Sequence, residues 1–145
     1  MQNHTLNISG ILEGFVLDHI PAGKGMEIYK YLNLENFDYC IAIIKNAKSR
    51  RMGKKDIIKI ECPIDSLNLG ILGFIDQNIT VNVVKNETIV EKKKLDLPDK
   101  IINIIKCKNP RCVTSVEHSL DQIFILTDRD KETYRCKYCE EHFKK

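Results

Sequence analysis

The chain has 145 residues, of which 43% are hydrophobic and 30% are charged, and its formal net charge is +3. This composition is typical of one globular domain or two small ones, and it excludes a disordered or collagen-like chain. No apolar run approaches the roughly eighteen residues that a membrane helix requires, and the first ten residues lack the features of a signal peptide. We therefore expect a cytoplasmic protein with no membrane partner.

The first part of the chain alternates strand-like and helix-like segments. Residues 6–17 are predicted to form a strand, or a strand pair broken near Gly10 and Gly14. The other predicted strands are 39–44, 56–61, 79–84 and 88–90, and the predicted helices are 24–32 and 67–74. Asp65 or Ser66 is the expected N-cap of the second helix. The apolar runs 39–44 and 56–61 are expected to be central strands, joined by a polar hairpin connection over 45–55.

The order of these elements is strand, helix, strand, strand, helix, strand, strand. It predicts an α+β, ferredoxin-like domain, with a five-stranded antiparallel sheet and two helices on one face. The other face would be left to solvent or to a partner, and about ninety residues give only a modest core. A dimer is therefore expected.

The segment Leu95–Asp99 is the expected domain boundary, which places the two domains at 1–98 and 99–145. The apolar stretch 100–106 leads into the second domain, which is too small to build an adequate core without a staple. Residues 113–116 and 123–126 are predicted to be short strands of this small, β-rich domain.

The cysteines can supply the cross-link that this small domain needs. The chain has six cysteines, and a reducing cytosol disfavours disulfides, so metal binding or catalysis is their expected use. Cys107 and Cys112 form one closely spaced pair, and Cys136 and Cys139 form another. Two such pairs can close a tetrahedron of thiolates about 2.3 Å from a Zn²⁺ ion, with no open coordination position. The spacing therefore predicts one structural zinc, whose binding energy is folding energy.

The remaining metal-ligating residue types are expected to have ordinary roles. His118 and His142 are rival ligands, but four cysteines complete the shell, so both histidines are predicted to be surface residues. Cys40 and Cys62 lie in predicted strands and are expected to be core thiols.

Several polar residues interrupt the apolar strands of the first domain. Lys59 and Asn82 lie inside strands, and Asp18-His19 ends the first one, so these groups, with Lys55 and 92–94, are expected to converge on one end of the sheet. Such a set suits an anion with a polar sugar. No phosphate-binding loop, catalytic triad or carboxylate dyad accompanies it.

Two other functions remain open at this point. One is a zinc-ribbon nucleic-acid-binding protein with an unrelated sheet domain, although the second domain lacks clustered basic residues with interleaved aromatics, which favours protein contact over nucleic acid. The other is a small metal-independent enzyme that uses Asp18 and His19 as an acid/base pair. Adjacent strand residues point to opposite faces, which counts against that pair.

Four stretches of the chain closely resemble the regulatory chain of aspartate carbamoyltransferase. They are GFVLDHIPAG at 14–23, MGKKDIIKIE at 52–61, TVN at 80–82 and the cysteine pairs, with CKYC at 136–139. The resemblance implies an allosteric nucleotide-binding domain followed by a zinc domain that contacts the catalytic chain. It also implies a non-catalytic subunit of pyrimidine biosynthesis. Its homodimers would join two catalytic trimers through three regulatory dimers into a dodecamer that CTP inhibits and ATP activates.

The resemblance also implies a nucleotide site. Its residues would be Ile11, Val16, Asp18, His19, Lys55, Lys59, Asn82, Val84, Ile89 and Lys92. In this assignment Ile11 and Val16 line the base pocket, with Val84 and Ile89 packing nearby. Asp18 and Lys59 hold the ribose. Lys92 meets the triphosphate, helped by His19 and Asn82, and Lys55 contributes. Ser9 and Glu87 stand where some relatives have an acidic and an aromatic residue, which leaves the preferred nucleotide open.

Overall fold

The computed structural model describes residues 10–145, and the chain forms two compact units that divide between Asp96 and Leu97. The predicted start of the first strand, at residues 6–9, and the departure at Ser9 lie outside the described residues. Within the described part, no helix has the length and apolar character needed to cross a membrane.

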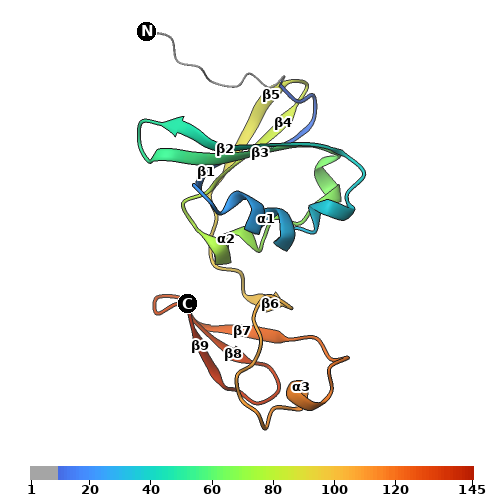
Figure 1. The fold of residues 1–145 in the computed structure, drawn as a ribbon, viewed down its shortest axis with the longest axis vertical. Coiled ribbons are helices and arrows are strands. Elements are labelled where there is room, and N and C mark those ends of the chain that lie inside the picture. The colour runs from blue at the N-terminus through green and yellow to red at the C-terminus, as the bar shows by residue number, and fades with distance from the viewer. Residues whose placement is uncertain (1–9) are drawn as a thin grey trace. The chain divides into compact units, whose positions relative to one another are not determined.

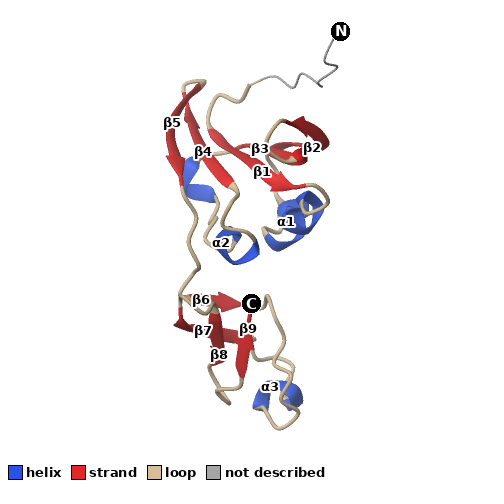
Figure 2. Ribbon diagram, turned by 90° about the vertical axis from the view of Figure 1, so that its left-hand side faces the viewer, coloured by secondary structure: helices blue, strands red, loops and turns tan. Residues whose placement is uncertain are grey.

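The first unit is a five-stranded antiparallel sheet with two helices. Its elements are β1 Gly14–Pro21, α1 Gly25–Tyr31, β2 Cys40–Ser49, β3 Gly53–Glu61, α2 Leu72–Ile75, β4 Thr80–Lys85 and β5 Thr88–Lys93. The strand order is β2-β3-β1-β4-β5, and every neighbouring pair is antiparallel. Both helices lie on the same side of the sheet (Figures 1 and 2). The predicted fold class is therefore confirmed.

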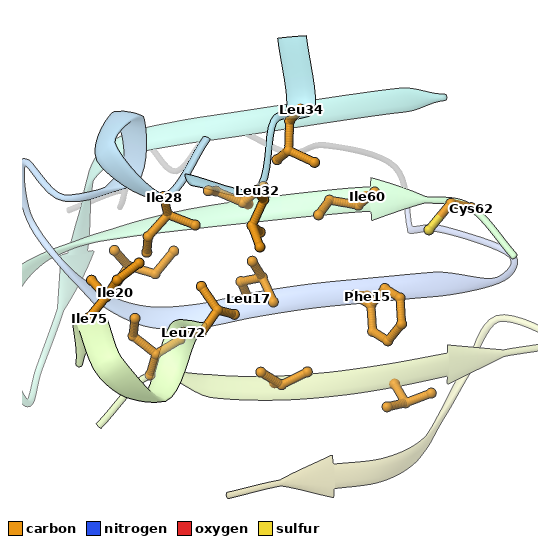
Figure 3. Close-up of a cluster of buried hydrophobic side chains, with 14 residues drawn as sticks. Phe15, Leu17, Ile20, Ile28, Leu32, Leu34, Ile60, Cys62, Leu72 and Ile75 are labelled. Carbon is orange, nitrogen blue, oxygen red and sulfur yellow. The ribbon is translucent and has the colours of Figure 1, made fainter. Parts of the chain in front are cut away.

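The core lies between the sheet and these helices. Phe15 and Leu17 of β1 point toward the helices and pack in one cluster with Ile28 of α1 and Leu72 of α2 (Figure 3). Because successive strand residues point to opposite faces, the alternate residues of β1, among them Val16, lie on the face that no helix covers. That uncovered face carries candidate nucleotide residues of several strands, among them Val16, Lys59 and Asn82.

The second helix is much shorter than predicted. In place of a helix from residue 67 to 74, the chain forms a 3₁₀ turn over Ile64–Ser66, irregular backbone, and the single turn of α2. Gly70 disfavours helix in the missing part. Gly73 lies inside α2, where a Cβ atom would be 1.8 Å from the carbonyl oxygen of Asp96. The chain therefore needs glycine at this position because another backbone segment approaches it closely.

Substituting Gly73 by alanine is expected to destabilise the first unit by about 2 kcal/mol or more, because the new methyl group must displace backbone rather than a flexible side chain. Thermal unfolding of the purified chain measures the effect. Gly10→Ala is the matched control, since its Cβ would meet no atom within 4 Å. Equal unfolding temperatures for the two variants would contradict the expectation.

The hairpin of β2 and β3 also differs from the prediction. Residue 45 onward was expected to be a polar connection, but β2 continues to Ser49 and β3 begins at Gly53, so most of this segment is strand. Of these two strands, which were both predicted to be central, β3 lies inside the sheet and β2 lies at its edge. A run of apolar residues indicates a strand, but it does not reveal which neighbours the strand will have in the sheet.

The second unit is a four-stranded antiparallel sheet with one helical turn. Its elements are β6 Lys100–Ile102, α3 Val113–Val116, β7 Ile123–Asp128, β8 Thr133–Cys136 and β9 His142–Lys144, with strand order β6-β7-β8-β9. The predicted strand at 113–116 is wrong, because these residues form α3. Tyr134 is fully buried, and its hydroxyl donates to the carbonyl of Pro98 at 2.7 Å.

Candidate functional site

The four paired cysteines converge in the second unit. Cys107 precedes α3, Cys112 directly precedes its first residue, Cys136 ends β8, and Cys139 lies in the turn before β9. Their sulfur atoms all lie within 4.8 Å of one another. The Sγ atoms of Cys107 and Cys139 are 3.4 Å apart, and those of Cys112 and Cys136 are 3.7 Å apart. A tetrahedral zinc–thiolate centre places its sulfurs about 3.8 Å apart, so the cluster fits one structural zinc.

Local hydrogen bonds hold the two turns in place. The backbone N–H of Cys112 donates to the carbonyl of Asn109 at 3.1 Å, and the N–H of Glu140 donates to the carbonyl of Cys136 at 2.9 Å. The N–H of Cys107 donates to Oε1 of Gln122, which ties the first turn to the segment before β7. These contacts shape the ligand shell from outside, as second-layer groups do at metal sites.

The pKa values of the cysteine thiols indicate how a bound cation would change their charge state. A hydrogen bond with the Thr114 hydroxyl, at 3.1 Å from Sγ, lowers the pKa of Cys112 to about 7. Burial raises the pKa of Cys107 to about 12 and also raises the pKa of Cys136. Metal binding requires all four to be thiolates. A divalent cation supplies the positive charge that lets these crowded sulfurs ionise together.

The other predicted ligand types lie outside the cluster. His118 and His142 are exposed, as expected. Among the described residues, only the four cysteines form a group of metal-ligating atoms. Cys62 is buried, as expected, and its burial raises the pKa of its thiol. The prediction for Cys40 is wrong: it begins the edge strand β2 and is exposed.

In the first unit, candidate nucleotide residues line up across four strands. Val16 of β1 pairs with Lys59 of β3 on one side and with Asn82 of β4 on the other, and Asn82 pairs with Lys92 of β5. Paired residues share a face of the sheet. These residues, which we call the cross-sheet row (Lys59, Val16, Asn82 and Lys92), therefore all lie on the uncovered face.

An apolar row runs beside the cross-sheet row. Val84 of β4 lies opposite Gly14 and Ile89, on the same face as Asn82 because the two residues are two positions apart. Val84 is buried and Ile89 is half exposed. Ile11 is buried ahead of β1, next to Leu12, whose carbonyl accepts the N–H of Glu87 at 3.0 Å. Apolar groups thus border one side of the cross-sheet row.

Charged groups border the other side. The Lys55 ammonium lies 2.9 Å from the Asp18 carboxylate. The chain bulges between Leu17 and Ile20, and His19 has a φ of 59° there. The His19 N–H donates to the same carboxylate at 2.6 Å, and its ring Nδ1 lies 3.0 Å from the Thr80 hydroxyl. The structure therefore brings Asp18, His19 and Lys55 together.

This arrangement determines the charge state of Asp18. Partial burial opposes ionisation, but the hydrogen bonds from Lys55 and from the His19 N–H outweigh it, so the pKa of Asp18 lies below its ordinary value of 3.8. A carboxyl group whose pKa is lower in the folded state stabilises the fold above its unfolded pKa. That contribution is lost as the pH falls through the folded-state value.

Asp18→Asn is accordingly expected to be less stable than the parent chain above pH 3.8, with the difference shrinking as the pH falls below that value. Urea unfolding at a series of pH values measures the difference. Asp65→Asn, which removes an exposed carboxylate, is the control. A stability difference that stays constant through the acid range would contradict the proposed cause.

Asn82 has an unusual environment in the cross-sheet row. Its side chain is 7% exposed, and its Oδ1 atom has no hydrogen-bond partner among the described residues. An unpaired buried carbonyl oxygen costs about 1–3 kcal/mol. Such groups are rare in native proteins and require an explanation. A ligand that donates a hydrogen bond at this point would satisfy it.

Sequence reasoning missed one residue beside the site. Asp56 follows Lys55 on β3 and is completely buried. The signal was present, because Asp56 shares its strand alternation with Ile58 and Ile60, which belong to the core. An acidic residue at a core-facing position needs internal partners.

Comparisons with known proteins agree over both units. Residues 6–96 match the family described as "Aspartate carbamoyltransferase regulatory chain, allosteric domain", and residues 99–145 match its "metal binding domain". A protein named as this regulatory chain from Clostridium botulinum is 55% identical over 136 residues, covering 94% of this chain and 92% of the relative. Those from Clostridium tetani and Bifidobacterium longum are 47% and 42% identical, each covering 96% of this chain and 96% and 99% of the relative.

Proposed function

Because this chain belongs to the family of aspartate carbamoyltransferase regulatory chains, we propose that it is a cytoplasmic subunit that binds CTP and ATP and passes their effect to catalytic trimers. Effectors would bind on the uncovered face of the first unit. The second unit, held by zinc, would dock on the catalytic chain.

The unpaired oxygen of Asn82 is the observation that carries the nucleotide site. It lies in a row with two lysines, at a position where the amino group or hydroxyl of a ligand can donate to it. In this proposal Lys92 meets the triphosphate, helped by His19 and by the Nδ2 group of Asn82, while Oδ1 of Asn82 accepts from an amino group or hydroxyl of the same nucleotide. Ammonium groups attract phosphates, and an apolar strip that can cover a base borders the same row.

The ribose and base take the remaining positions. Asp18 and Lys59 would hold the ribose hydroxyls, with Lys55 keeping the Asp18 carboxylate in place. Ile11 and Val16 would line the base pocket, and Val84 and Ile89 would pack beside it. Exposed Glu87 lies in the turn after Val84, and its charge would bear on which base is preferred.

Exposed apolar residues support the proposed assembly. Val113 and Val116 lie in α3, directly after the metal ligand Cys112, and are 45% and 77% exposed. A helical turn held rigid by the metal and carrying apolar side chains is suited to docking another protein. In the first unit every residue of β5 is exposed, including Ile89 and Val90. This supports a regulatory homodimer, and three such dimers would join two catalytic trimers into a dodecamer.

The proposal requires that effector affinity differ between a low-activity and a high-activity assembly, a coupling of about 1–3 kcal/mol. The test is to mix the purified, zinc-loaded chain with a catalytic trimer and to assay carbamoyl transfer with CTP, with ATP and with neither. We expect co-elution of the two chains and an activity that depends on the nucleotide. Co-elution with activity unaffected by either nucleotide would refute the regulatory role and leave the docking role intact.

A further inference from the structure

A buried carboxylate on β3 accepts hydrogen bonds from two separate stretches of backbone. Asp56 is 0% exposed, and its Oδ2 accepts the N–H of Gly25 at 2.9 Å and that of Gly23 at 3.1 Å. Its other oxygen, Oδ1, accepts the N–H of Asn46 at 3.0 Å. Both carboxylate oxygens are thus engaged by backbone donors from outside β3.

These N–H donors lie in irregular segments, where the backbone hydrogen bonds of helices and sheets leave them without a partner. Gly25 begins α1, whose N-cap residue Lys24 makes no side-chain capping hydrogen bond. Asn46 has a φ of 59° and lies where the β2–β3 register shifts between Ile44 and Ala47. Helix starts and β-bulges both leave N–H groups without ladder partners. Asp56 satisfies them from the neighbouring strand.

The same carboxylate lies beside the charged end of the candidate site. Asp56 is opposite Ile20, directly after the bulge in β1 that holds Asp18 and His19. Lys55, the residue before Asp56, makes the 2.9 Å ion pair with Asp18. The bulge in β2, the bulge in β1 and the loop after β1 therefore all lie against one residue.

We propose that Asp56 is a positioning residue for effector binding: by fixing the loop after β1 and the bulge of β2, it holds Lys55 against Asp18 in the geometry that the nucleotide requires. This inference rests on the proposed function and deepens it. It holds that Asp56, on the core side of β3, affects nucleotide affinity at a site on the opposite face of the sheet.

The site is built for a carboxylate. An amide can accept on one atom only, so in Asp56→Asn one set of backbone donors would face an N–H group. No room is left between Gly25 and the Asp56 carboxylate, because a Cβ at Gly25 would lie 2.7 Å from Oδ2 of Asp56. Gly25→Ala therefore keeps the carboxylate but displaces it, which gives a second and independent perturbation.

The experiment compares the zinc-loaded full chain with Asp56→Asn, Gly25→Ala and the exposed-carboxylate control Asp65→Asn. Calorimetry with CTP and with ATP, well below each variant's unfolding transition, gives nucleotide affinity. NMR titration of the carboxyl carbon gives the pKa of Asp18, which reports whether Lys55 is still in place and needs no nucleotide. Zinc content and the thermal transition show whether both units are folded.

We expect Asp56→Asn and Gly25→Ala to bind nucleotide about tenfold or more weakly, corresponding to the loss of one charge-assisted contact. The pKa of Asp18 should rise toward its ordinary value in both variants, and Asp65→Asn should match the parent chain. Unchanged affinity and an unchanged Asp18 pKa in a folded variant would show that Asp56 only stabilises the fold, and would overturn the inference.

The two readouts separate this inference from the proposed function. If the parent chain binds neither nucleotide, the proposed effector site is wrong, and the Asp18 pKa alone decides whether Asp56 positions Lys55. If Asp56→Asn does not fold, Gly25→Ala decides by the same two measurements. Weaker nucleotide binding with an unchanged Asp18 pKa would also contradict the inference, since the effect would not pass through Lys55.

Discussion

Cys112→Ala is expected to release the metal, unfold the second unit and abolish assembly with catalytic trimers. Structural zinc contributes about 10–16 kcal/mol of apparent binding free energy in small zinc domains, and Cys112 is an almost completely buried ligand. Its loss leaves three thiols and a cavity at the start of α3. The four-stranded sheet cannot compensate, because its core is small.

Atomic absorption, circular dichroism and co-elution with a catalytic trimer measure the three effects. Cys40→Ala is the matched control, because it also removes a cysteine but lies exposed at the start of β2, in the other unit. It should retain one zinc per chain and assemble normally. A Cys112→Ala chain that keeps its zinc and co-elutes with the trimer would rule out the four-cysteine centre as the basis of docking.

Lys92→Ala is expected to weaken nucleotide binding about 10- to 100-fold while leaving assembly unchanged. Removing a charged hydrogen-bond donor from a phosphate costs about 1.5–3 kcal/mol, and each 1.4 kcal/mol is about tenfold in affinity. The residue pairs with Asn82 on the uncovered face and is exposed, so its removal disturbs no core contact.

The adjacent lysine supplies a control for charge. Lys93 pairs with Val81 and lines a cavity with Phe15 on the helix-covered side, so it points away from the cross-sheet row. Lys93→Ala changes the net charge by the same amount and should bind CTP and ATP like the parent chain in calorimetry. Equal losses in the two variants would indicate a general electrostatic effect and would exclude a specific phosphate contact at Lys92.

The metal centre could be predicted from the sequence because its information is local. The spacing of Cys107 and Cys112, and of Cys136 and Cys139, fixes two tight turns, and tetrahedral coordination then leaves one way to combine them. The element order of the first unit was predictable for a similar reason: each strand and α1 carries its own apolar periodicity. These features require no knowledge of distant contacts.

The sequence predictions that proved wrong concern residues whose structure or exposure depends on contacts with distant parts of the chain. The sequence around residue 73 does not reveal that the Asp96 carbonyl approaches Gly73 and leaves no room for a side chain there. Cys40 shares an apolar run with core residues but begins an edge strand, so its exposure follows from strand order. Residues 113–116 have the β-branched composition of a strand, yet they form a helical turn directly after a metal ligand.

The nucleotide residues fall between these two cases. Their identity followed from a family resemblance, whereas the cross-sheet row exists only because β3, β1, β4 and β5 are hydrogen-bonded side by side. No sequence spacing relates Lys59 to Lys92. The unpaired oxygen of Asn82 was also invisible before the fold was known, because burial and partner loss are properties of the assembled sheet.

All four sulfur ligands lie in the second unit, while every proposed effector residue lies in the first. Nucleotide binding would therefore not require zinc, whereas docking on the catalytic chain would. Under the proposed function, a chain made without zinc is expected to bind nucleotide in its first unit and to lose docking through its second unit. Zinc supply would then decide whether a bound nucleotide can affect the catalytic chain at all.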